Sequence, residues 1–145
     1  MTYNKLGFAF TGLRTLSFAI IEKTHAKTGK INFETNLRFG LDIDSRSVSC
    51  NARFEFENKK GSPFLILELQ ALFQIEEGDF SSKVKQSENT YLIVRDLAVH
   101  FAVLTIGAAR GVLHTKTEGT NFNEYLLPTI DVNNLLKEDL IFTIS

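Results

Sequence analysis

The polar residues that could carry out chemistry are few and lie far apart along the chain. The three histidines are His25, His100 and His114, and Asp96 precedes His100 by four residues. On a helix this spacing puts both side chains on one face, where the carboxylate could orient the imidazole as a general base. The same spacing more often marks a polar contact that satisfies a histidine on an apolar helix. We favour this second interpretation and predict no catalytic residue.

The single cysteine and the acidic residues give no stronger indication of an enzyme. Cys50 alternates into the apolar face of an expected strand, which favours a buried thiol over a nucleophile. One cysteine excludes a disulfide within the chain and is typical of a reducing compartment. The acidic residues between Glu55 and Asp79 lack the ligand spacing of a metal site, and no nucleotide-binding or hydrolase motif is present. We expect no cofactor, no metal and no enzymatic activity.

Length and charge narrow the class of protein further. The 145 residues are most simply one domain over 1–145, long enough to bury a hydrophobic core. Sixteen basic and seventeen acidic residues nearly cancel, which argues against a nucleic-acid partner. The first residues faintly imitate a secretion signal, but Gly12 and Arg14 interrupt the apolar run. We therefore expect a cytoplasmic protein.

Alternation of apolar and polar residues predicts four antiparallel strands. The pattern is clearest over residues 31–43, and the other strands are expected at 13–22, 48–57 and 64–75. In the first strand, Leu16, Phe18 and Ile20 are expected on one face. In the fourth strand, the residues expected to face the core are Leu65, Leu67, Leu69, Ala71, Phe73 and Ile75.

The other face of the fourth strand is unusually apolar for a surface exposed to water. It carries Glu68 and Gln70, and beside them Phe64, Ile66 and Leu72. Apolar residues on an exposed face are typical of a contact surface. We therefore predict that a partner docks on this sheet face, at Glu68 and Gln70.

Residues 91–113 predict one long helix around which the chain is organised. Its apolar residues fall on two sides of the helical wheel, so it needs two surfaces to bury against. The sheet supplies one surface, and we expect a second copy of the chain to supply the other, helped by a strip of small residues. The expected oligomer interface consists of Ala98, Val99, Ala102, Val103, Ile106 and Ala109.

Charged residues argue against a membrane-spanning role for this helix. The uncharged run from Leu97 to Ala109 is shorter than the roughly 20 apolar residues that cross a bilayer. We expect no membrane insertion.

The C-terminal region predicts an apolar crossover loop and a short second helix that Asp131 could cap. The expected fold is therefore α+β: a four-stranded antiparallel sheet, a long helix, an apolar crossover loop and a short second helix layered on one sheet face.

The order of these elements and several short motifs resemble the SecB family of protein-export chaperones. The motifs begin with Glu68-Leu69-Gln70 and Leu72-Phe73 and continue with Ala109-Arg110 and Gly119-Thr120-Asn121-Phe122. They end with Leu126-Leu127-Pro128-Thr129-Ile130-Asp131-Val132 and Leu135-Leu136. The resemblance covers about residues 13–140, with motif agreement from residue 64 onward. The chain departs from the family at Gly107, in a region where the family often has a proline.

The resemblance implies a chaperone that holds unfolded or precursor polypeptides without ATP and assembles as a dimer of dimers. The implied client-binding groove is lined by Phe122, Tyr125, Leu126, Leu127, Ile130, Leu135 and Leu136. The same residues could instead form the core beneath the crossover loop, and the sequence favours neither reading.

The implied partners differ within the family. Typical members are strongly acidic and continue into a tail that docks the SecA motor, whereas this chain is nearly neutral and the sequence ends at Ser145. These departures argue against SecA and favour at least equally a chaperone attached to a toxin–antitoxin system, with an antitoxin as partner.

Two other classes of protein remain open from the sequence. A hotdog-type enzyme or ligand-binding domain, acting on acyl thioesters, would use Asp96 and His100. In that fold, however, the helix normally lies between early strands, and here it follows all four. A structural adaptor dedicated to one partner protein is the other alternative.

Overall fold

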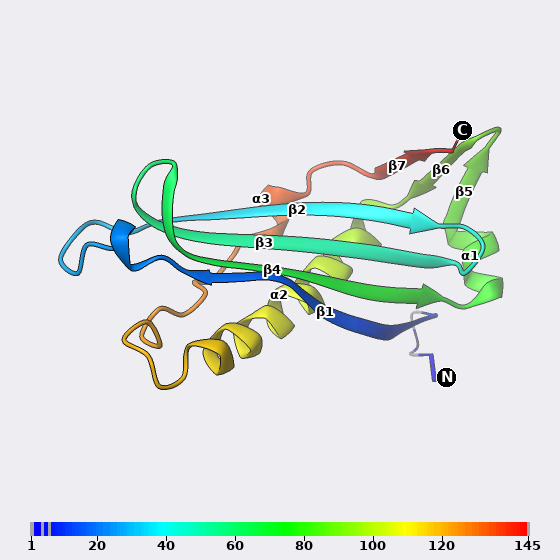
Figure 1. The fold of residues 1–145 in the computed structure, drawn as a ribbon. Coiled ribbons are helices and arrows are strands. Elements are labelled where there is room, and N and C mark those ends of the chain that lie inside the picture. The colour runs from blue at the N-terminus through cyan, green and yellow to red at the C-terminus, as the bar shows by residue number, and fades with distance from the viewer. Residues whose placement is uncertain (1, 4, 6, 145) are drawn as a thin grey trace.

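The fold has two layers, a twisted four-stranded sheet and a long helix that crosses one of its faces. The computed structural model describes residues 2–3, 5 and 7–144. Figure 1 shows helix α2, Arg95–Thr117, running obliquely along the sheet. The sheet is antiparallel with the strand order β1-β4-β3-β2, and its strands are β1 (Phe8–Ile20), β2 (Asn32–Asp42), β3 (Ser47–Lys59) and β4 (Ser62–Ile75). The predicted α+β class, with its antiparallel sheet and long helix, is confirmed.

The inner face of the sheet, towards α2, is formed by the alternating residues that the sequence pattern indicates. On β4, the residues from Leu65 to Ile75 that were expected in the core are all buried. The prediction that Phe64 faces outward is wrong, because its ring is fully buried in the core. The β3–β4 pairing is irregular between Phe56 and Lys59, so the period of two is lost where the strands meet their turn.

Strand β1 is longer and less regular than expected. It begins at Phe8, which pairs with Ile75, rather than at residue 13. Its pairing with β4 shifts between Phe10 and Gly12 and again between Thr15 and Ser17. The second shift leaves Leu16 without a partner on β4, between Thr15 opposite Leu69 and Ser17 opposite Glu68, so the prediction that Leu16 shares a face with Phe18 is wrong. A bulge inserts one residue and so exchanges the faces beyond it.

The segment between β4 and α2 forms structure where, before residue 91, the sequence pattern predicted neither a strand nor a helix. It contains α1 (Glu77–Lys83), β5 (Val84–Ser87) and β6 (Thr90–Ile93). Strand β7, Leu140–Thr143, joins them in a second sheet of order β5-β6-β7. The prediction that the long helix starts at Tyr91 is therefore wrong. Tyr91 pairs with Phe142 across the two strands, a partner that no local pattern reveals.

The remaining elements are short. A 3-10 turn, η1 (Glu22–Thr24), follows β1, and α3 (Val132–Leu135) lies between α2 and β7. Asp131 caps α3, as predicted, because its carboxylate accepts a hydrogen bond from the Asn133 backbone N–H at 3.1 Å. Helix α2 ends at Thr117, shortly before Gly119, whose φ of 79° suits a glycine beyond a helix end.

By length and composition alone, α2 would suffice to cross a membrane. Its small residues Ala98, Ala102 and Ala109 are fully buried within the chain. Core helices of globular proteins have the same composition, so this is weak support for a membrane span.

The single cysteine lies between sheet and helix. Cys50 is fully buried on β3, beside the Thr105 side chain of α2, whose hydroxyl donates to the Phe101 carbonyl oxygen at 2.8 Å. Burial raises the pKa of the thiol from 9.0 to about 11, with the Thr105 contact opposing the shift. The thiolate is therefore scarce in the folded protein, which agrees with the expected unreactive role.

We expect Cys50 to react with the thiol reagent DTNB only as fast as the chain unfolds. The folded pKa lies above the unfolded value, so the folded state holds its proton to higher pH. Below pH 9.0 the thiol is protonated in both states, and its ionisation costs no stability. The free energy of unfolding then falls as the pH rises towards about 11, because the unfolded thiol loses its proton first. Absorbance measures the rate of DTNB labelling in native buffer, where Cys50 is buried, and in urea, where the chain is unfolded. Native labelling at the rate of a free thiol would contradict the buried position.

Candidate functional site

The residues predicted to line a client groove lie mostly on one segment that returns across the inner face of the sheet. We call residues 118–131 the crossover strap; Figure 1 shows it leading from the end of α2 towards α3. Phe122, Tyr125 and Leu127 are buried in the core, with 5%, 8% and 5% of their surfaces exposed. Leu126 is 60% exposed and Leu135, on α3, is 43% exposed. Ile130 and Leu136 are partly buried against the core.

The expected groove residues therefore divide into a buried set, an exposed set and the partly buried Ile130 and Leu136. Phe122, Tyr125 and Leu127 are core residues in this structure, and only Leu126 and Leu135 offer large exposed apolar surface. The division follows from alternation along an extended chain, in which neighbouring side chains point to opposite sides.

An aromatic cluster lies beneath the strap. The ring of Phe64 has its centroid 5.0 Å from Tyr125, 6.1 Å from Phe122 and 4.6 Å from His25. The His25 ring, from the loop after η1, also lies 4.8 Å from Phe122. These contacts tie the β1–β2 connection, the start of β4 and the strap to one another.

A hydrogen bond at the edge of this cluster joins His25 Nε2 to the Tyr125 hydroxyl at 2.6 Å. Burial, and next the nearby Glu124 carboxylate, raise the pKa of Tyr125 above its ordinary value of 10.0. The phenol therefore stays protonated at neutral pH. Beside the pair is an open hollow of about 580 Å³, lined by Glu22, His25, Lys27, Thr120, Asn121, Phe122 and Glu124.

Polar side chains hold the backbone of the strap at few points. Arg110 of α2 donates from Nη2 to the Pro128 carbonyl oxygen at 2.9 Å. Near the start of the strap, Asn123 Nδ2 donates to the His114 carbonyl oxygen at 3.0 Å and to Thr117 Oγ1 at 3.1 Å. Arg110 therefore reaches the strap from α2, and Asn123 reaches α2 from the strap.

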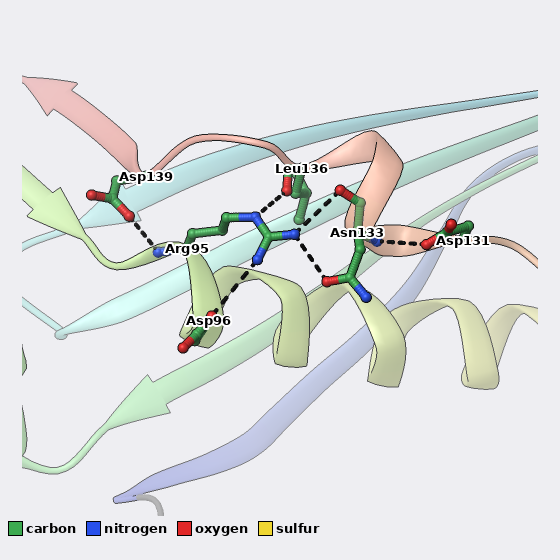
Figure 2. A network of polar contacts seen from close by, with 6 residues as sticks. All are labelled: Arg95, Asp96, Asp131, Asn133, Leu136 and Asp139. Carbon is green, nitrogen blue, oxygen red and sulfur yellow. Dashed lines mark hydrogen bonds and ion pairs between the residues drawn. The ribbon is translucent and has the colours of Figure 1, made fainter.

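The residues that follow the strap are held by Arg95, the first residue of α2 (Figure 2). Its guanidinium donates to the Leu136 carbonyl oxygen at 2.5 Å and to Asn133 Oδ1 at 2.9 Å. Its backbone N–H donates to the Asp139 carboxylate at 2.7 Å. The Val94 N-cap makes no side-chain capping bond, so Asp139 satisfies an N-terminal amide of α2 from a distant part of the chain.

We expect Arg95→Ala to loosen the C-terminal segment without unfolding the large sheet. Hydrogen bonds from a charged group contribute about 1.5–3 kcal/mol, and partial exposure of this side chain places the expected loss at the lower end. Amide hydrogen exchange in residues 132–143 should become faster, while β3 and β4 stay protected. Arg38→Ala, which removes an exposed arginine from β2, is the control. Equal exchange in the two variants would show that Arg95 does not hold the segment.

Most of the residues predicted to form the oligomer interface lie on the side of α2 that is buried within the same chain. Ala98, Ala102, Ile106 and Ala109 are buried inside the single chain, so they are not free to contact a second copy. Val99 is partly buried against the core, and Val103 is 49% exposed. The small side chains are buried within the chain, next to the large rings and aliphatic groups of the sheet.

The outward side of α2 carries Val103, Gly107 and Gly111, all exposed. A Cβ added at either glycine would meet nothing within 4 Å. Neither glycine is therefore required by close packing within the chain.

The predicted docking residues on the outer sheet face are engaged with arginines. Glu68 Oε1 lies 3.4 Å from Arg53 Nη1, and Gln70 Oε1 accepts a hydrogen bond from Arg14 Nη2 at 2.9 Å. Arg53 also pairs with Glu55 at 3.1 Å. The face is therefore mixed in charge.

The candidate acid–base pair is not assembled. The Asp96 carboxylate is 96% exposed and lies 3.7 Å from Arg95, whereas the His100 ring packs edge-on against Phe8 at 5.4 Å. Within the described part of the chain, no group of three or more His, Cys, Asp or Glu side chains is placed to hold a metal.

Sequence reasoning missed His25 and Arg110, which position the strap, and Arg95, which holds the segment that follows it. Arg110 belongs to the Ala-Arg motif, which was a usable signal. His25 and Arg95 act on partners 100 and 41 residues away, for which the sequence has no local signal.

Comparison with known proteins gives a likeness among solved structures. No protein-family model and no curated protein sequence matches the chain. Among solved structures, the chain is similar to the SecB-like chaperone Rv1957 of Mycobacterium tuberculosis, in complex with a ChAD peptide from the Rv1956 HigA1 antitoxin. The match covers 87% of this chain and 97% of that chain, with a TM-score of 0.50 and 11% sequence identity. At this identity the likeness is one of fold, and the architecture is SecB-like.

Proposed function

We propose that this protein is an ATP-independent chaperone that holds non-native polypeptides. The single observation that carries the proposal is the SecB-like fold, shared with a chaperone described in complex with an antitoxin peptide. The proposed clients are unfolded or precursor polypeptides, or the exposed segment of an antitoxin. The proposed place of action is the cytoplasm, with no nucleic-acid partner, no membrane insertion and no enzymatic reaction.

Exposed apolar side chains support the proposal. Leu126 and Leu135 lie on the strap and α3, and Ile141 of β7 is 64% exposed. Burial of apolar surface stabilises a complex by about 25 cal/mol per Å² and is non-directional, so it suits clients of many sequences.

The edge strand of the large sheet offers a second kind of contact. Strand β2 is at the edge of the large sheet, and its pairing with β3 runs without a shift from Asn32 to Asp42. Such an edge can hydrogen-bond an extended peptide through its backbone, independently of sequence. Strand β1, the opposite edge, is interrupted by bulges and is less suited to this role.

We also propose that copies of the chain associate through the outward side of α2, around Val103, Gly107 and Gly111. Glycine within a helix costs about 1 kcal/mol relative to alanine, so two exposed glycines without an intrachain role favour close approach by another molecule. A dimer of dimers is the assembly that the SecB resemblance implies.

Docking of SecA is a weaker proposal. Arg14 and Arg53 neutralise the sheet face that includes Glu68 and Gln70. An antitoxin-type partner is favoured instead, since the structurally similar chaperone is described with an antitoxin peptide.

The hotdog-enzyme alternative receives little support. The helix follows the four long strands, and the carboxylate of Asp96 does not face His100 but lies beside Arg95.

Suppression of aggregation tests the proposed function. Unfolded citrate synthase is diluted from denaturant into buffer with and without the purified chain, in the absence of ATP, and light scattering is followed. We expect scattering to fall at or below equimolar amounts. No suppression at several-fold excess, with one co-purifying partner bound stoichiometrically, would instead select a dedicated adaptor.

A further inference from the structure

The strap lies on the sheet in the way that an extended peptide lies in a binding site. No hydrogen bond between backbone groups involves residues 126–130 within the described part of the chain. Burial alternates along it: Tyr125 and Leu127 are buried, and Leu126 between them is 60% exposed. This segment is therefore held by its side chains, as an extended ligand is held by pockets for alternate residues.

The surface beneath the strap is not specific for the residues that occupy it. Tyr125 packs 5.0 Å from Phe64 and 5.9 Å from Phe56, measured between ring centroids. Aromatic and aliphatic contacts of this kind depend on area and shape, with little directional requirement. Another extended segment with large apolar side chains at alternate positions could make the same contacts.

Residues 125–130 of the strap can also leave without disrupting a helix or a sheet, while Asn123 still bonds to α2 and Asp131 still caps α3. Between residues 126 and 130 its polar anchor is the bond from Arg110 to the Pro128 carbonyl oxygen, and before it Tyr125 bonds to His25. The buried surface lost on opening is recovered if an incoming chain fills the same space. Exchange of one apolar segment for another is therefore much less costly than simple exposure of the core.

We infer that the crossover strap is an internal substitute for a client, and that an unfolded polypeptide rich in aromatic and aliphatic residues displaces it. The incoming side chains take the place of Tyr125 over Phe56 and Phe64 and the place of Leu127 in the same core cluster. This inference rests on the proposed function and locates its binding surface under the strap. Because the strap competes for the same surface, the apparent affinity for a client is the intrinsic affinity multiplied by the fraction of time that the surface is open. This competition keeps client binding reversible.

Two adjacent positions allow a direct test. Leu127→Cys and Leu126→Cys are each made in a Cys50→Ala background, so that each variant carries one thiol, buried at position 127 and exposed at 126. The client is reduced, carboxymethylated α-lactalbumin, which stays unfolded and has no free thiol. Its fluorescence anisotropy reports binding in the same samples in which DTNB labelling is measured.

We expect saturating client to speed labelling of Leu127→Cys by more than about fivefold, because the bound state holds the strap open. The Leu126→Cys variant, already exposed, should change little. Protection of Leu126→Cys with Leu127→Cys still unreactive would mean that clients dock on the outside of the strap, and would overturn the inference. So would unchanged rates in both variants while anisotropy shows binding.

Cys50 in the unmodified chain is the control for general unfolding. It is fully buried but packs in the other core cluster, with Phe73 and Phe101. If client speeds labelling of Cys50 as much as of Leu127→Cys, the whole domain opens and the strap has no special role. If no client binds the unmodified chain, the proposed function itself fails, a result distinct from binding without strap displacement.

A second variant tests the inference without altering a buried side chain. Arg110→Ala removes the anchor at Pro128, and loss of one such hydrogen bond should raise client affinity roughly two- to tenfold. Arg38→Ala is the control for loss of one exposed positive charge. Lower or unchanged affinity in Arg110→Ala, relative to Arg38→Ala, would overturn the inference.

Discussion

Replacing Phe64 with alanine should lower the free energy of unfolding by about 3–5 kcal/mol. Phe64 is fully buried and contacts the rings of His25, Phe122 and Tyr125. Its removal takes away apolar contact and leaves a cavity that the surrounding core can close only in part. Urea unfolding followed by circular dichroism measures the change, since the chain has no tryptophan.

The matched control for Phe64→Ala is Leu126→Ala. This substitution shortens a strap residue that is 60% exposed, so it should change the free energy of unfolding by less than about 0.5 kcal/mol. Similar losses in the two variants would contradict the core position of Phe64. A smaller loss in Phe64→Ala, together with faster exchange confined to residues 118–131, would mean that the strap alone depends on this ring.

Alanine at both Gly107 and Gly111 should stabilise the folded chain and weaken its association with a second copy. Each substitution should stabilise the isolated chain by about 1 kcal/mol, because alanine forms helix more readily than glycine. Apart from the nearby backbone of α2 itself, no atom lies within 4 Å of the added Cβ atoms, so no clash opposes this gain. If a second copy packs on this side of α2, the added methyl groups hold it away and weaken association.

Sedimentation velocity over a range of concentrations measures association, and thermal unfolding at low concentration measures the stability of the single chain. Val103→Glu, on the same side of α2, should also dissociate the assembly, by placing a charge in the contact. Glu34→Ala, at an exposed position on β2, is the control and should leave association unchanged. A double glycine variant that is more stable and equally associated would place the interface elsewhere.

Several features of the fold followed from local pattern alone. A period of two needs only the pleat of a strand, so strands β2, β3 and β4 and the buried side of β4 were predictable. Cys50 was correctly placed as a buried residue for the same reason. The motifs after residue 64 led to a SecB resemblance, and the likeness to the fold of Rv1957 supports that fold.

The candidate site was predictable only in part. Every residue expected in the groove is on or near the crossover strap, but the sequence could not separate Leu127, which is buried, from Leu126, which is exposed. Both are leucines in an irregular segment without a long period. Only the tertiary structure, which packs Leu127 into the core cluster and leaves Leu126 outside it, distinguishes them.

What the sequence determined by itself was the set of residues that must be hidden from water and the local period with which they repeat. The tertiary structure decided which surface hides each of them. A helical wheel gives the relative angles of side chains on α2, but not which side meets the chain's own sheet, and the small side of Ala98, Ala102 and Ala109 proved to be the buried one. Strands β6 and β7 likewise exist because residues about 50 positions apart pair with each other, as Tyr91 does with Phe142, and such distant pairing leaves no mark on either local pattern.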